Sequence, residues 1–159
     1  MILFDFGGLI KGDSQYPDHK EWIQLQSARL NVDRDIEQTG GASDRKPGTP
    51  DFDDITLTKF ADVASVDLFI QAVGGKKPQK KVKIHFCNVT SKGPKVIMSW
   101  ELENAFLSSY EVSSDGARPF ETVTLNFSQI KLGYTGFKAD GKSKKISPKG
   151  WNLETGGQI

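Results

Sequence analysis

The sequence predicts a mainly β fold: a small β-barrel of two packed antiparallel sheets, with one short α-helix at its side and a long extended loop. Segments in which apolar and polar residues alternate run along most of the chain. One segment carries apolar residues at helical spacing, and residues 34–52 carry almost no apolar periodicity. The 159 residues suit one domain, which we expect to span 1–159.

The expected strands follow the alternation of apolar residues in chain order, and there should be about six to eight of them. Two segments change phase by one residue, near Gln26–Ser27 and near Ser128–Gln129, and the second change indicates a β-bulge. Two other segments have one clean apolar face each, formed by Val82, Ile84 and Phe86 and by Val96, Met98, Trp100 and Leu102. The expected strands are 2–6, 22–32, 55–60, 82–87, 96–102, 105–112 and 122–134.

The expected helix spans 65–74. Ser65 is a suitable N-cap residue, and the carboxylate of Asp67 would lie in the first turn, where it favours the helix dipole. Gly74 and Gly75 end the helix. Its apolar stripe consists of Leu68, Phe69, Ala72 and Val73.

The C-terminal tail, 136–159, begins with a stretch rich in lysine, glycine and serine. We interpret 136–150 as a loop, after which Trp151 and Leu153 can dock back onto the body.

Composition excludes several partners and compartments. The net charge of +1 provides no overall field that would recruit nucleic acid or a membrane. One cysteine allows no intramolecular disulfide. The N-terminus has no basic region followed by an apolar run, so we expect no signal peptide, and no stretch approaches the ~20 apolar residues of a membrane span. We therefore expect synthesis in the cytoplasm, and no classical export signal.

No motif indicates catalysis, a metal or a cofactor. His85 and Cys87 share one strand face, but the only other histidine, His19, falls in an expected loop, and zinc sites need three or four ligands. No nucleophile elbow is present. The sequence GGKK at 74–77 follows a helix instead of preceding one, which favours a helix end over a phosphate loop. We expect no enzyme activity.

Charge is distributed unevenly between two segments. Residues 76–95 contain seven lysines and no acid, whereas 33–54 contain seven acids and three bases. The plainer interpretation is two solvated loops. The alternative is that one copy meets the opposite charge of another, which is a head-to-tail contact that makes rings or filaments.

Five segments, taken together, resemble the haemolysin-coregulated protein (Hcp) family, which builds the inner tube of the type VI secretion system. They occur in the family's order and spacing. They are IKGDSQ (10–15), ITLTKFADVASVDLFIQAVGGKK (55–77), ELENAFLSSYEVSSDG (101–116), ETVTLNFSQIKLGY (121–134) and GWNLE (150–154).

The resemblance implies a homohexameric ring that stacks into a tube inside a contractile sheath. It implies as partners a spike protein of the VgrG type, the sheath and baseplate, and effector proteins carried in the lumen. The protein would be cytoplasmic before firing and then secreted without a signal peptide.

The resemblance also assigns roles to residues. The loop 34–52 matches the family's loop that projects towards the neighbouring ring. The net acidity of this loop, and not the resemblance, indicates that lysines within 76–95 form a possible basic counter-surface on the next ring. Two further residues match positions that face the lumen. The three groups are Gln38, Gly40, Gly41, Asp44, Arg45, Lys46, Pro50 and Phe52 in the loop; Lys76, Lys77, Lys80 and Lys81 in the counter-surface; and Arg29 and Asp115 in the lumen.

Three other functions remain open. A phage-like tail tube protein would share the fold and the assembly. A monomeric small-barrel module would bind a ligand in a cavity lined by aromatic residues. A hydrolase would use Cys87 as its nucleophile.

Overall fold

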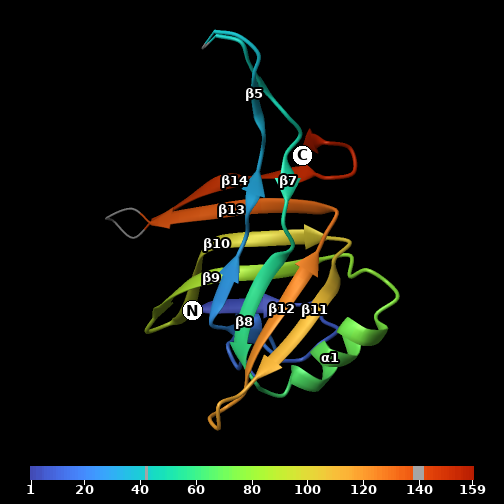
Figure 1. Cartoon of the computed structure of the whole chain (residues 1–159). Coiled ribbons are helices and arrows are strands. Elements are labelled where there is room, and N and C mark those ends of the chain that lie inside the picture. Colours follow the sequence, from blue (N-terminus) through green and yellow to red (C-terminus); the bar gives the residue numbers. More distant parts are fainter. Residues whose placement is uncertain (42, 138–141) are drawn as a thin grey trace.

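The computed structural model describes residues 1–41, 43–137 and 142–159. They form fifteen strand segments, one α-helix and a short 3-10 helix (Figure 1). The segments are β1 (Ile2–Asp5), η1 (Pro17–His19), β2 (Ile23–Leu25), β3 (Ser27–Arg29), β4 (Val32–Asp33), β5 (Ile36–Gln38), β6 (Arg45–Pro47), β7 (Asp51–Phe52), β8 (Ile55–Phe60), α1 (Ser65–Gly74), β9 (Val82–Thr90), β10 (Gly93–Glu103), β11 (Phe106–Ser113), β12 (Phe120–Asn126), β13 (Gln129–Phe137), β14 (Ser143–Asn152) and β15 (Gly157–Gln158).

Two antiparallel sheets carry the fold, as predicted. The large sheet has the order β15-β14-β13-β10-β9-β1-β2, and the small sheet has the order β11-β12-β8-β3. They meet at one edge, where the Gln26 N–H donates to the Thr58 carbonyl oxygen at 2.8 Å. The helix α1 packs against β11 at the other edge of the small sheet. The two sheets stay separate, so the barrel is open.

One apolar layer joins the sheets. The small sheet contributes Leu57 and Val123, and the large sheet contributes Phe4, Ile84 and Leu102, all with no exposed surface. They belong to one continuous cluster, which also includes Leu68 of α1. Side chains from the facing sheets interdigitate in this way in β-sandwiches.

The two phase changes in the sequence mark places where the chain moves from one sheet to the other. At Gln26 the chain leaves β2 of the large sheet and enters β3 of the small sheet, and after β12 it returns through Phe127 and Ser128 to β13. The prediction of one bulged strand over 122–134 was therefore wrong. A strand that changes sheets must turn its apolar side towards the same core from a new direction, which shifts the pattern by one residue.

A bulge occurs elsewhere, between β9 and β10. Val96 pairs with Cys87, but Met98 pairs with Phe86, so the register shifts between Val96 and Met98. The predicted face that placed Val96 together with Met98 was therefore wrong, because a bulge reverses the side on which residues beyond it point.

Cys87 is buried, and burial raises the pKa of its thiol, against the opposing charge of the N-terminal amine.

The predicted loop over 136–150 was wrong wherever the structure describes it, since residues 136–137 end β13. Residues 143–152 form β14, which pairs with β13 on one side and, near its end, with β15 on the other. Its first seven residues are exposed and include three lysines, so the sequence shows no alternation there. Lysines are common on strands near a sheet edge because they discourage pairing with other chains. Trp151 and Leu153 pack against the core, as expected. Residues 138–141 lie outside the described part.

The helix α1 covers the predicted span 65–74, but its N-cap position lies one residue before the predicted cap. Ala64 occupies the N-cap position, and Ser65 is the first helical residue. No side chain caps the helix at Ala64, and Asp62 instead fixes the turn before it, since its carboxylate accepts a hydrogen bond from the Ala64 N–H at 2.9 Å. Leu68 is buried, but Phe69 and Val73 of the predicted stripe are largely exposed.

Among the described residues, no helix has the length and apolarity to cross a membrane.

The two histidines form a pair that the sequence did not indicate. His19, on η1, is 3% exposed, and its Nε2 lies 2.8 Å from Nδ1 of His85 on β9. Trp22 contacts both rings at centroid distances of 4.7 Å. One ring donates and the other accepts, so the contact requires at least one neutral imidazole. The pair holds the segment before β2 against the large sheet.

Burial keeps both imidazoles neutral. It lowers the pKa of His85 to about 4, helped by the charges of His19 and Lys83 and opposed by Glu101. Burial also lowers the pKa of His19, against the opposing charge of Asp18. The unfolded chain therefore binds protons that the folded chain excludes. The resulting stability is present above the unfolded pKa of ~6.5 and is lost as pH falls towards 4.

We expect the free energy of unfolding to fall by roughly 1–2 kcal/mol between pH 7 and pH 4.5 because of this pair. The full shift would give more, but His85 is only partly buried. Urea denaturation at several pH values measures the slope. The double variant His19→Phe/His85→Phe should show a flatter profile, and an equal slope in both proteins would contradict the assignment.

Candidate functional site

A long arm projects from the body at one end of the small sheet (Figure 1). We define the arm as the described residues of 32–52. Its base is the pair β4–β7, and its outer part is the pair β5–β6. Glu37 lies opposite Lys46 and Gln38 lies opposite Arg45, so cross-strand pairs of opposite charge and of hydrogen-bonding groups support a hairpin with no apolar core. The segment without periodicity is therefore a polar ribbon.

The arm is anchored only at its base, among the contacts that are described. The ring of Phe52 packs edge-on against Phe127 at 6.1 Å. The amide of Asn31 donates to Asp33 at 2.7 Å and to Asp53 at 2.9 Å, which joins the two strands where they leave the body. The predicted loop residues Gln38, Gly40, Gly41, Asp44, Arg45 and Lys46 are all exposed, and Pro50 and Phe52 are partly buried.

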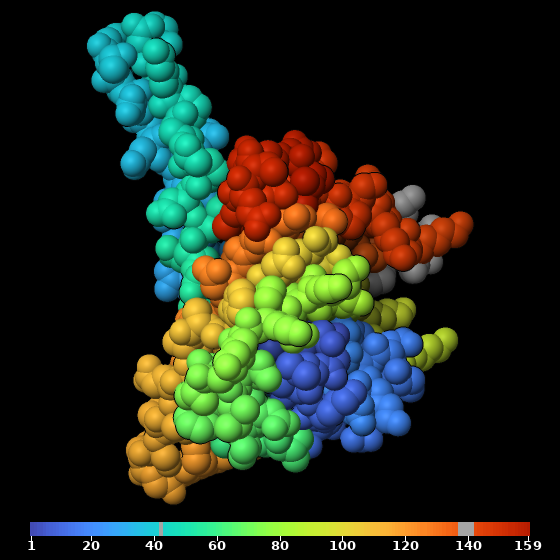
Figure 2. All heavy atoms as spheres, turned by 90° about the vertical axis from the view of Figure 1, so that its right-hand side faces the viewer, coloured from blue at the N-terminus to red at the C-terminus, as the bar shows by residue number. Residues whose placement is uncertain are grey.

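The predicted basic counter-surface lies on another side of the molecule. Lys76, Lys77, Lys80 and Lys81 are exposed on the connection between α1 and β9, and Figure 2 shows this connection beside α1, away from the arm. Two backbone hydrogen bonds between Gln79 and Ala105, at 2.8 and 2.9 Å, fix its middle. Lys81 also approaches Glu101 at 3.3 Å. The arm and these lysines do not meet within one chain.

The outward face of the small sheet is rich in hydroxyl groups, and we call it the hydroxyl face. Two rows of residues cross all four strands, and neighbours in a row are direct cross-strand partners. Ser27 and Thr58 are joined by a hydrogen bond at 2.5 Å, and Ser109 and Thr124 by one at 2.6 Å. The rows are Arg29, Thr56, Thr124 and Ser109, and Ser27, Thr58, Thr122 and Glu111.

The two predicted lumen residues lie at opposite ends of the small sheet. Arg29 is exposed on β3, opposite Thr56 near the start of β8. Asp115 is exposed in the turn between β11 and β12, beyond the pair of Phe60 and Phe120 that closes the other end. The structure does not bring these two charges together.

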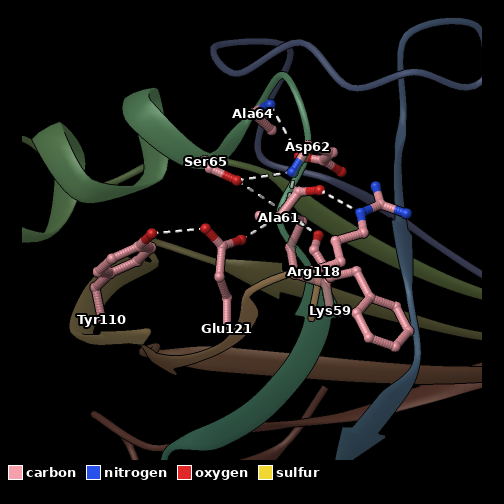
Figure 3. Close-up of polar contacts among 9 residues, drawn as sticks. Lys59, Ala61, Asp62, Ala64, Ser65, Tyr110, Arg118 and Glu121 are labelled. Carbon is pink, nitrogen blue, oxygen red and sulfur yellow. Dashed lines mark hydrogen bonds and ion pairs between the residues drawn. The ribbon is translucent and has the colours of Figure 1, made fainter. Parts of the chain in front are cut away.

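A fully buried lysine lies beneath the start of α1 (Figure 3). The ammonium of Lys59 lies 2.6 Å from Glu121 Oε2 and 2.8 Å from Asp62 Oδ1. It also donates to the Phe60 carbonyl oxygen at 2.9 Å. The other oxygen of Glu121 accepts from the hydroxyl of Tyr110 at 2.6 Å. The network therefore satisfies the lysine and both oxygens of Glu121 inside the protein, as buried charges require.

The hydrogen-bond donors decide the charge of Glu121. Burial alone would raise the pKa of its carboxyl, but hydrogen bonds from Lys59, Tyr110 and Ser65, with the charge of Lys59, outweigh burial and lower it. The pKa of Tyr110 is raised to about 12 by burial, by its hydrogen bond to Glu121 and by the charge of that carboxylate. Glu121 is thus an ion and Tyr110 a neutral donor at neutral pH.

This network joins three strands and the turn before α1 instead of opening to solvent. Lys59 comes from β8, Glu121 from β12 and Tyr110 from β11, and Asp62 lies in the turn before α1. Arg118 continues it outward, donating to the Ala61 carbonyl oxygen at 2.8 Å. All of its groups bind one another, so the arrangement is suited to fixing α1 on the small sheet and not to binding a substrate.

A pattern in the sequence could have revealed the network, although the prediction missed it. In ITLTKF the core-facing positions are Ile55, Leu57 and Lys59, so a lysine takes a core position. In FETVTLN the corresponding residues are Glu121, Val123 and Leu125. Opposite charges at core positions of two strands indicate a buried ion pair once the strands are known to be neighbours.

The candidate metal ligands are not brought together as a site. His85 bonds to His19, whereas Cys87 lies beside the N-terminal residue, whose backbone exchanges hydrogen bonds with it. Within residues 1–41, 43–137 and 142–159, no group of three or more histidine, cysteine, aspartate or glutamate side chains could hold a metal ion.

The described residues form a double-sheet body with a buried polar network beneath its side helix, and a polar ribbon that projects from one end. A family model described as "Type VI secretion system effector, Hcp" matches residues 4–134. The chain belongs to this Hcp family, and the resemblance is confirmed.

Individual relatives agree with this assignment. The chain is 32% identical over 104 residues to protein hcp1 of Pseudomonas aeruginosa, a match that spans 63% of each chain. A solved type six secretion system protein has a TM-score of 0.87 at 24% identity, over 99% of this chain and 98% of that one. Hcp1 of Salmonella typhimurium has a TM-score of 0.77 at 21% identity, over 99% and 97% of the two chains. The two structures show the same fold.

We expect Lys59→Met to destabilise the protein by about 3–5 kcal/mol, because it leaves the buried carboxylate of Glu121 without its cation. The matched control is Lys131→Met, which removes a partly exposed contact to Glu103 at 3.5 Å and should cost less than about 1 kcal/mol. Urea denaturation measures both. Equal losses in the two variants would show that the network does not hold the fold.

Proposed function

We propose that the protein is a structural tube subunit of a type VI secretion system, in which hexameric rings stack into an inner tube. The observation that carries the proposal is the arm. A polar ribbon that leaves the body, with no described contact beyond its base, is suited to reaching a neighbouring molecule (Figure 1). Membership in the Hcp family supports the identity of that neighbour as another copy.

The hydroxyl face suits the wall of a water-filled lumen. Its threonine and serine hydroxyls bond to one another, so the face is polar without being strongly charged. Arg29 at one end adds a positive charge, and Glu111 adds a negative one. We place Arg29 and Asp115 at the lumen, where they would contact an effector protein. A wall of hydroxyl groups would allow such cargo to slide out during ejection.

Charge distribution supports stacking through the arm. The segment 33–54 contains seven acids against three bases, and the exposed lysines at 76, 77, 80 and 81 lie on another side of the body. Because these charges do not meet within one chain, they are available between chains. Assembly would then be sensitive to salt.

The remaining parts of the proposal follow from this role. The partners are other copies, the spike protein, the sheath and baseplate, and effectors. The protein would lie in the cytoplasm before firing and leave the cell inside the tube. The role requires no chemistry of its own, and the driving energy would come from sheath contraction.

The packed core favours a tube subunit over a ligand-binding barrel. Phe4, Leu57, Ile84, Leu102 and Val123 fill the space between the sheets, where such a module would hold its ligand. A phage-like tail tube protein would use the same surfaces, and the match to the type VI family favours the secretion system.

Deleting residues 38–49 should leave hexameric rings intact and abolish stacking, since it removes the outer arm but not its base at Phe52. Size exclusion with light scattering measures the ring, and negative-stain microscopy shows the tube. Replacing the same residues by an equal number of glycines and serines is a control for chain length, and it should fail to stack as well. Normal tubes from the deletion would contradict the role of the arm.

A further inference from the structure

Residues 11–22 lead from the core to the start of β2, and we call them the strap. The strap closes on itself, since the Gly12 N–H donates to the Glu21 carbonyl oxygen at 2.7 Å. Each hydrogen bond that the structure describes for the strap stays within it, except the contact between His19 and His85. That contact is therefore the polar link between the middle of the strap and the large sheet.

The strap contains several features that disfavour its closed conformation. Glu21 has a φ of 62°, a left-handed conformation that residues other than glycine rarely adopt. Among the residues that the structure describes, three buried side-chain atoms have no hydrogen-bond partner, and Ser14 Oγ and His19 Nδ1 are two of them. A buried polar atom without a partner loses its hydration and gains nothing in return. The few contacts that hold the strap closed act against these terms.

The unpartnered nitrogen assigns the hydrogens of the histidine pair. A buried N–H without an acceptor is rarer than a buried acceptor without a donor, so the hydrogen of His19 lies on Nε2 and not on Nδ1. His19 Nε2–H then donates to Nδ1 of His85 at 2.8 Å. A further proton on His85 Nδ1 would remove this acceptor. A further proton on His19 Nδ1 would bury a charged N–H that has no acceptor. The closed strap therefore has no suitable place for an added proton.

We propose that the contact between His19 and His85 is an acid-sensitive latch, which releases the strap from the large sheet while the two sheets stay folded. Once released, both imidazoles reach water and bind the protons that the closed pair excludes. Burial lowers the pKa of both rings, so opening is favoured as the pH falls below the unfolded value of ~6.5. The apolar core cluster contains none of the strap residues, so release leaves the core intact. The latch is independent of the proposed tube role.

Charges on the surrounding elements adjust the latch. Two acids, on η1 and β10, favour a proton on the pair, and three lysines, on β9, β10 and β14, oppose one. The N-terminal ammonium on the neighbouring chain end adds a further positive charge, bonded to the Cys87 carbonyl oxygen at 3.0 Å. Because the positive charges outnumber the acids, they favour release of a protonated strap. The side chains are Asp18, Glu101, Lys83, Lys95 and Lys145.

Release of the strap would reshape one end of the body. Asp13 of the strap lines a cleft of about 150 Å³ together with Phe60, Asp62 and Arg118, close to the turn before α1. Opening removes Asp13 from this cleft. Acid would therefore change the surface beside the start of α1 without unfolding the sheets.

Hydrogen exchange followed by mass spectrometry tests the latch on the native chain. Protection of peptides that cover the strap is measured at about pH 7.5 and about pH 5.5, and the same peptides from the chain unfolded in urea correct for the intrinsic effect of pH. We expect strap protection to fall at least tenfold at the lower pH, because opening lets two imidazoles of pKa ~6.5 bind protons. Peptides from β8 and β12 should change less than about twofold. Unchanged strap protection, or an equal loss in the sheets, would overturn the latch.

A double variant removes the titration and keeps the hydrogen bond. In His19→Gln/His85→Asn, the glutamine N–H donates in place of Nε2 and the asparagine oxygen accepts in place of Nδ1. Its strap protection should be the same at both pH values. The matched control is Lys11→Met, which breaks the exposed ion pair to Glu21 at 2.9 Å inside the strap and should keep the pH response. A response that persists in the double variant, or is lost in the control, would overturn the latch and leave the proposed function standing.

Discussion

The buried contact between Lys59 and Glu121 determines where α1 can lie, and the outer surface depends on that placement. The two residues come from adjacent strands, and the lysine also binds Asp62, which fixes the turn before the helix. A buried ion pair often contributes little net stability over an apolar replacement, because desolvation offsets the attraction. We therefore interpret this pair as a determinant of geometry: an apolar pair would pack equally well but would not hold the helix start in one orientation.

A second constraint is that both sheets must share one apolar layer. The chain meets it by changing sheets at Gln26 and at Phe127–Ser128. The sequence carried this information, since the apolar phase shifts at both places. It could not tell a bulge from a change of sheet, because both displace the pattern by one residue. The strands with buried faces, the helix and the antiparallel packing could be predicted, because burial of one face imposes a regular spacing of apolar residues along the sequence.

The features that sequence reasoning missed lie where burial does not control the pattern. The strand β14 is solvated along most of its length, so its lysines gave no period. The pairing of β5 with β6 depends on cross-strand charges and has no core. The contact between His19 and His85 joins residues 66 positions apart, and only the folded sheet brings them together. Lys59 differs from these cases, since its core-facing position was visible in the alternation of ITLTKF.

The distribution of surfaces explains why such a chain would assemble in one direction. The arm leaves the body at one end of the small sheet, and α1 flanks the edge formed by β11. Contacts between copies that join the arm to a different surface unite unlike surfaces and can therefore repeat. The charged arm is suited to selecting a partner of complementary charge. Loss of the Lys59 contacts would free the start of α1, so the same buried charges that orient the helix also set the surface that it presents to other molecules.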